Sequence, residues 1–274
     1  MSGPKIAALY GLIPNQLGFC GPQQNLLRKF IAGKLMIPEI VPVLEKFEAA
    51  YAYYELIAKK NKIKTGPLNK RVIEAYWIGN ELLDKVTADD LRQMIIDKFT
   101  KPGLLSKEKA AALAKQIPDS AKPHHSFHVL ILGSITGRVN FTGDTKLKDI
   151  CRIGWGRVTR IVIPACASPM ASARRAKAGV QTKKAGFRVK HGMTNTAKII
   201  VKYNPLVGKK FLQFGKARDK EIFWDKEILP ETKTGDWVSF HWNYAIQILR
   251  EIDIINLFKY TKNTLDTLNK NYGR

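Results

Sequence analysis

The hydrophobic pattern changes at Cys151, and this change limits the fold more than any other feature of the sequence. From residue 23 to about residue 116, apolar residues recur at the spacing of amphipathic helices. After Cys151 they gather in short segments rich in β-branched and aromatic side chains, which is typical of strands. Helical spacing returns over residues 246–271. The sequence therefore predicts an α+β protein, with an all-α N-terminal domain, a small OB-like β-barrel and a C-terminal helix.

The chain is long enough for two domains, since its 274 residues exceed the roughly 100–200 of one usual domain. The change of pattern at Cys151 suggests where they divide. We expect a helical domain over residues 1–149 and a barrel with its closing helix over residues 150–274. Residues 164–196 are small, polar and basic, and are predicted to form a long exposed loop between the first two strands. The short apolar run at 126–132 fits either a strand or a buried helical turn.

The sequence also predicts the compartment. No apolar run approaches the roughly 18–20 residues that would span a bilayer. The start of the chain lacks the basic-then-apolar layout of a signal peptide. The 3 cysteines include no CxxC pair, which argues against a disulfide framework or a zinc ribbon. We therefore expect a cytoplasmic protein without a membrane partner.

Two fragments of the second half together resemble the motifs of a known protein family. Residues 151–158 read CRIGWGRV, and residues 235–246 read GDWVSFHWNYAI. In spacing and order they resemble the HypC/HupF family of hydrogenase-formation chaperones, which has a cysteine at the start of the barrel, a histidine near its end and a helix last. In this chain the cysteine is internal, whereas the family's becomes N-terminal, and Trp155 stands where the family has proline.

The resemblance implies a site and a task. Cys151 and His241 correspond to the family's proposed ligands for an iron that carries cyanide and carbonyl groups during assembly of the [NiFe] hydrogenase centre. It implies a non-catalytic accessory protein or chaperone of hydrogenase maturation, with a maturation partner or the hydrogenase large subunit as its partner.

Residue chemistry agrees with this implied iron site. A thiolate and a neutral imidazole suit a low-valent iron, and we expect Arg152 and the surrounding positive charge to favour the thiolate. Without the resemblance, a buried cysteine and a strand-end histidine that only pack and hydrogen-bond would be the simpler interpretation.

The first half resembles an uncharacterised bacterial and archaeal domain family that continues into the same barrel, with matching segments at 14–22, 74–82 and 123–128. These segments hold residue types found in transition-metal sites. A second metal or substrate site is therefore predicted from His124, His125, His128, Cys20 and Glu81. Glu81 is included because it follows Glu74 by about two helical turns and could face the histidines. The alternative is a packed, hydrogen-bonded corner beside a solvated carboxylate.

Basic residues suggest another function. The net charge is +23, and residues 150–218 contain 16 Lys and Arg but no acidic residue. A flexible basic loop would bind RNA or DNA through phosphates without sequence selectivity. The nucleic-acid-binding residues would be Arg174, Arg175, Lys177, Lys183, Lys184, Arg188 and Lys190. A solvated loop and a loop that docks on an acidic protein are the alternatives.

Overall fold

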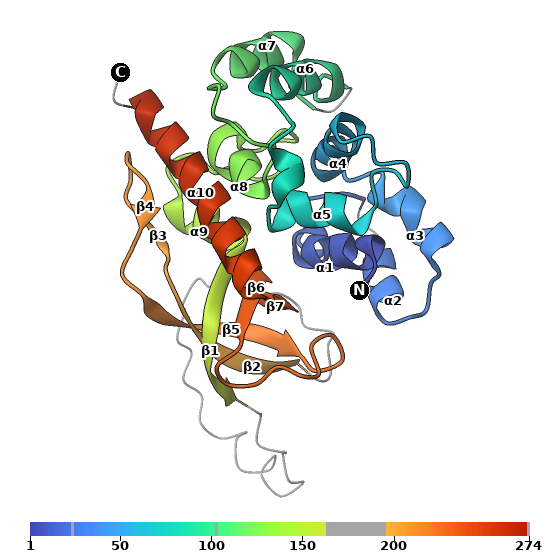
Figure 1. Ribbon diagram of the computed structural model, residues 1–274, viewed down its shortest axis with the longest axis vertical. Coiled ribbons are helices and arrows are strands. Elements are labelled where there is room, and N and C mark those ends of the chain that lie inside the picture. The colour runs from blue at the N-terminus through green and yellow to red at the C-terminus, as the bar shows by residue number, and fades with distance from the viewer. Residues whose placement is uncertain (23–24, 102–103, 163–195, 273–274) are drawn as a thin grey trace, which may run out of the picture.

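The computed structural model describes residues 1–22, 25–101, 104–162 and 196–272. Helices come first along the chain, a barrel follows, and one long helix ends it (Figure 1). The α+β class and the order of its parts are thus confirmed. Among the described residues, no helix combines the length and apolar character that a bilayer-crossing helix needs.

The helical part is built around α1 (Gly3–Gln16), which is buried along nearly its whole length because apolar residues occur on all its faces. The other elements of this part are α2 (Leu26–Ile31), α3 (Ile37–Leu44), α4 (Glu48–Lys60), α5 (Lys70–Trp77), η1 (Glu81–Leu83), α6 (Ala88–Lys98), α7 (Lys107–Lys115), α8 (His125–Phe127), η2 (His128–Leu132) and α9 (Thr145–Cys151). Helix α6 begins after Thr87, which forms a reciprocal capping box with Asp90. The apolar run at 126–132 is helical, with α8 continuing into the π-helical turn η2.

The barrel contains five strands: β1 (Gly154–Val162), β2 (Thr196–Tyr203), β5 (Arg218–Asp225), β6 (Trp237–His241) and β7 (Tyr244–Ile248). They close in the order β1-β2-β5-β7-β6, and β6 pairs with β1. Among the described strands, β5 and β7 pair in parallel and the other pairs are antiparallel. The short strands β3 (Leu206–Val207) and β4 (Gln213–Phe214) form a separate hairpin.

Strand β7 corrects one detail of the sequence interpretation. The helical spacing placed the start of the last helix near Ile246, yet residues 244–248 pair with β6 and the helix α10 (Glu251–Tyr272) begins only at Glu251. The cause is the turn before β7, where Trp242 and Asn243 adopt φ values of 51° and 60° and reverse the chain.

The C-terminal helix α10 joins the barrel to the helical part. Its Tyr260 hydroxyl donates to the Asn80 carbonyl oxygen at 2.9 Å, and its Thr261 hydroxyl bonds Ser126 Oγ at 2.9 Å. Tyr260 packs so closely on Gly79 (φ +96°) that a Cβ atom there would lie 2.2 Å from the ring. One hydrophobic core runs from the helical part into the β6–β7 turn and α10, while the barrel has a smaller core of its own. The barrel and the helices therefore meet along a packed junction.

Candidate metal centre

Cys151 lies at this junction, at the last position of α9. Asp144 caps the start of α9, because its carboxylate accepts a hydrogen bond from Leu147 N at 2.8 Å. Arg152 then adopts an extended backbone, and β1 starts two residues later. Cys151 is buried, with 7% of its surface exposed. The thiol is therefore fixed between a helix end and the first strand of the barrel.

His241 reaches the same place from the far end of the barrel sequence. It is the last residue of β6, directly before the turn at Trp242 and Asn243. Asn adopts positive φ readily, whereas Trp rarely does. The turn is held against α9 by a hydrogen bond from Trp242 N to the Ile150 carbonyl oxygen at 3.0 Å. This bond places His241 beside Cys151.

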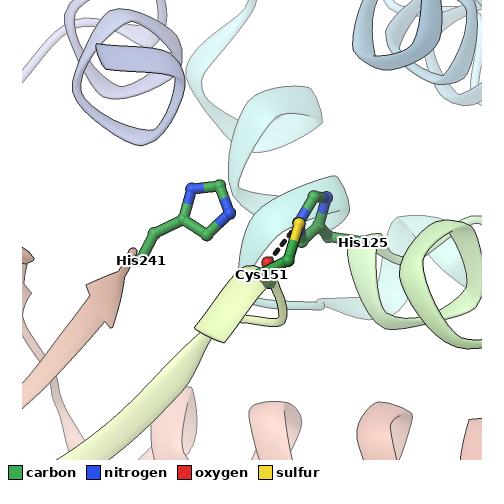
Figure 2. Close-up of side chains that lie close together, drawn as sticks. All are labelled: His125, Cys151 and His241. Atoms are coloured by element: carbon green, nitrogen blue, oxygen red, sulfur yellow. Dashed lines mark hydrogen bonds between the residues drawn. The ribbon is translucent and has the colours of Figure 1, made fainter. Parts of the chain in front are cut away.

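His125 completes the cluster from the helical part. It begins α8, whose N-terminus is capped by His124, and its Nε2 donates a hydrogen bond to the Cys151 carbonyl oxygen at 2.9 Å. One ligand atom from each of His125, Cys151 and His241 lies within 4.8 Å of the other two (Figure 2). The structure thus unites both residues of the predicted iron site with one residue of the predicted second site.

A hydrogen bond from the His241 ring to the Tyr10 carbonyl oxygen defines the tautomer of His241. Its Nδ1 lies 2.7 Å from the Tyr10 carbonyl oxygen, which only accepts, so Nδ1 carries the proton. Nε2 then has a free lone pair, and this buried atom has no hydrogen-bond partner among the residues that the structure describes. Histidines that bind metals commonly donate their other N–H to a carbonyl in this way. His241 is therefore prepared to bind a metal through Nε2.

Burial controls the charge of the cluster. It lowers the pKa of His241 from 6.5 to about 4 and that of His125 well below 6.5, so both rings are neutral at pH 7. Burial also raises the pKa of the Cys151 thiol well above 9.0, and an interaction with the Trp242 side chain opposes this rise only in part. A metal would therefore have to displace the thiol proton.

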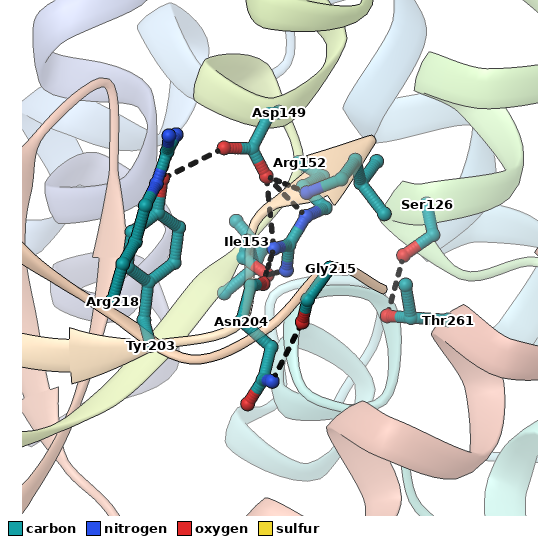
Figure 3. Close-up of polar contacts among 10 residues, drawn as sticks. Ser126, Asp149, Arg152, Ile153, Tyr203, Asn204, Gly215, Arg218 and Thr261 are labelled. Atoms are coloured by element: carbon teal, nitrogen blue, oxygen red, sulfur yellow. Dashed lines mark hydrogen bonds and ion pairs between the residues drawn. The ribbon is translucent and has the colours of Figure 1, made fainter. Parts of the chain in front are cut away.

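Arg152 does not activate the thiol as expected from the sequence. Its guanidinium is buried in an ion pair with Asp149, with 2.9 Å between Nη2 and Oδ1, and it also donates to the Asn204 carbonyl oxygen at 2.7 Å (Figure 3). The Asp149 carboxylate further accepts from the Tyr203 hydroxyl at 3.1 Å. The charge of Arg152 is thus used to hold α9 to the barrel.

A cavity of about 60 Å³ adjoins the three donors. Since one water needs roughly 10–15 Å³ of such space, the cavity has room for several small ligands. Its wall is mainly apolar and includes Phe19, Phe47 and Trp77. A metal bound here would keep open positions in a largely dry surrounding.

The other residues of the predicted second site separate into two groups. Cys20 and His128 line the same cavity but lie outside the three-donor cluster, and burial raises the pKa of Cys20 to about 12. His124 instead caps α8 and stacks on Tyr260, with 5.7 Å between ring centroids. Glu81 is exposed and pairs with Arg71. Neither His124 nor Glu81 joins the cluster.

The predicted nucleic-acid residues between Arg174 and Lys190 lie outside the described residues. Nucleic-acid binding therefore stays a prediction from the sequence.

An aromatic layer around the cluster was not predicted as part of the site. Trp77 packs against both imidazoles, with ring centroids 4.5 Å from His125 and 5.6 Å from His241, and it stacks on Tyr10 at 4.8 Å. Tyr76 bonds His125 Nδ1 at 3.0 Å. Tyr76 and Trp77 are buried in the core, and no local sequence pattern shows that this part of the core surrounds donor atoms.

Stability should fall on mild acidification because the buried histidines resist protonation. The pKa is lowered from 6.5 to about 4 in His241 and His128 and to about 3 in His124, so the unfolded chain takes up protons near pH 6.5 while the folded chain does not. Their contribution to stability is therefore complete above about pH 7 and decreases as the pH falls toward 4. We expect a lower urea midpoint at about pH 5 than at about pH 7.5, with a smaller difference in His128→Gln. Equal midpoints in the wild-type protein would contradict the buried, neutral state of these rings.

The fold and the cluster together define an α+β protein with a buried cysteine–histidine donor set where its barrel meets its helices. Comparison with protein-family models matches residues 1–169 and 188–274 to DUF6390, described as a family of unknown function. The match includes both the helical part and the barrel, so the chain belongs to the DUF6390 family. Comparisons with curated proteins and with solved structures found no match.

Proposed function

We propose that this protein is a non-catalytic accessory protein or chaperone of [NiFe] hydrogenase maturation that holds an iron fragment at Cys151 and His241. The observation that carries the proposal is the free, buried Nε2 of His241 beside the Cys151 thiol at the edge of a cavity. Leaving a buried polar atom unpaired costs about 1–3 kcal/mol, which a bound metal would offset.

The donor set suits such a cargo. A thiolate is a soft ligand and a neutral imidazole is a ligand of intermediate softness, and both bind iron. Cyanide and carbonyl groups on the iron would need space and protection from water, and the apolar cavity supplies both. The residues of this chain would bind and shield the cargo without changing it chemically.

The proposal includes a location and partners. A reduced Cys151 thiol requires a compartment where thiols are not oxidised, which favours the cytoplasm. Because the three donors are buried, delivery would require a partner that receives the iron as the junction opens. A maturation protein or the hydrogenase large subunit would be this partner.

The test is to produce the full chain anaerobically together with a hydrogenase maturation system and to record its infrared spectrum. The proposal predicts co-purification of a maturation protein or large subunit, and cyanide and carbonyl stretching bands that disappear in Cys151→Ser. A protein that shows no bands and captures no such partner would rule out the carrier function.

A further inference from the structure

We propose that His125 is a third protein ligand, so that the helical part and the barrel together form one two-histidine, one-cysteine centre for a divalent transition-metal ion. This deepens the proposed function by giving the helical part a role in the same site. It rests on the metal site of the proposed function, and its test with simple divalent cations separates that site from the role in hydrogenase maturation.

The position of His125 supports a direct bond to the metal. Its ring centroid lies 5.1 Å from that of His241, with the two planes at 85°. Its Nε2 side faces Cys151, as the hydrogen bond to the carbonyl of that residue shows (Figure 2). A metal bound to three donors needs distances of roughly 2.0–2.3 Å to each. Donor atoms within 4.8 Å of one another need only small side-chain shifts to reach this geometry.

The hydrogen bonds of His125 permit the change that ligation requires. In this structure Nε2 carries the proton that it donates to the Cys151 carbonyl, and Nδ1 accepts from the Tyr76 hydroxyl. A tyrosine hydroxyl can also accept a hydrogen bond. When the proton moves from Nε2 to Nδ1, the Nδ1–H group donates a hydrogen bond to the Tyr76 oxygen, and the Nε2 lone pair becomes free for the metal. Tyr76 is then a positioning residue.

The proton balance of binding follows. The ion M²⁺ forms bonds to Cys151 Sγ, His241 Nε2 and His125 Nε2, and the thiol proton leaves to solvent. His241 keeps its Nδ1 proton on the Tyr10 carbonyl, and His125 keeps one proton, now on Nδ1. One proton is released for each metal bound, and no electron is transferred. Since the donors come from three elements, α8, the end of α9 and β6, binding should also hold the helical part against the barrel.

The first test uses Co²⁺ as the probe, because its visible bands report coordination and its near-ultraviolet charge-transfer band reports a thiolate ligand. Loss of a hydrogen-bond partner of a metal ligand typically weakens metal binding roughly 10–100-fold. In anaerobic titrations of the full chain, His125→Ala should weaken Co²⁺ binding by more than this, and should alter the visible bands. Its thiolate band should persist. Tyr76→Phe should weaken binding roughly 10-fold yet keep the visible bands of the wild type.

His128→Gln is the matched control. His128 lines the same cavity and its ring stacks on that of His125, but it is not one of the three clustered donors. It should bind Co²⁺ as the wild type does. Wild-type affinity and visible bands in His125→Ala would overturn the proposal.

A measurement on the unaltered protein keeps the proposal testable if His125→Ala does not fold. The chain has 5 histidines, and in ¹⁵N-labelled protein two ring nitrogens should move to metal-bound chemical shifts on addition of Zn²⁺. A shift in one histidine only would contradict ligation by His125. If both rings shift but the infrared bands are absent, the centre stands and hydrogenase maturation is rejected.

Discussion

Cys151→Ser is expected to reduce the affinity of the full chain for Zn²⁺ by more than about 100-fold, because it removes the thiolate ligand. By comparison, loss of a residue that only hydrogen-bonds a ligand reduces metal affinity roughly 10–100-fold. Zn²⁺ is used here as a redox-inert probe of the donor set. The affinity is measured by competition with a chromophoric chelator under reducing conditions. His241→Ala should have an effect of similar size, since it removes the free Nε2 lone pair.

Cys20→Ser is the matched control for Cys151→Ser. Cys20 lines the same cavity and carries the same functional group, but it is not one of the three clustered donors. We expect its Zn²⁺ affinity to equal that of the wild type. If Cys20→Ser weakened binding as much as Cys151→Ser, the metal would lie elsewhere in the cavity and the assignment of the centre would be wrong.

Asp149→Asn is expected to cause the largest loss of stability, on the order of 3–5 kcal/mol in the free energy of unfolding, because it leaves a buried charge uncompensated. The side chain of Arg152 is 1% exposed and that of Asp149 is 6% exposed. Asn keeps the size of Asp and can still accept from Leu206 N, but its Nδ2 cannot accept from the Tyr203 hydroxyl, so the loss combines the charge with that hydrogen bond. Urea unfolding of wild type and variant measures the difference.

Glu221→Gln serves as the control for this prediction. Glu221 pairs with Lys198 at the surface of the barrel, where the side chain of Glu221 is 52% exposed and that of Lys198 is 44% exposed. Exposed pairs contribute about 0–1 kcal/mol, so this variant should stay close to the wild type. Equal stabilities for Asp149→Asn and Glu221→Gln would show that the buried pair does not hold α9 to the barrel.

The closeness of Cys151 and His241 was expected from the resemblance of their two sequence fragments to the HypC/HupF family. Alternation of β-branched and aromatic residues locates the strands, and the order of motif fragments indicates which strand ends meet. The structure adds the cause, a bond from Trp242 N to the Ile150 carbonyl that joins the two ends. The resemblance therefore predicted that Cys151 and His241 lie close together. In the structure, their closeness depends on closure of the barrel.

The third donor was not predictable in the same way. A domain boundary after residue 149 assigned His125 and Cys151 to different sites, because periodicity reports elements and not how they pack together. Glu81 is the opposite case, a residue that was expected in the second site but lies outside the cluster. It was expected to continue the stripe of Glu74, but α5 ends at Trp77 and Gly79 turns the chain with φ +96°, so helical spacing no longer applies. Only tertiary contacts decide both cases.

X-ray absorption at the iron edge of the anaerobically loaded full chain tests the central claim most directly. Our account predicts a first shell that contains one sulfur from Cys151 and imidazole nitrogen, together with the carbon atoms of the cyanide and carbonyl groups. In Cys151→Ser the sulfur should be absent from that shell. A shell of oxygen and nitrogen alone in the wild-type protein would contradict the assignment of Cys151 as a ligand.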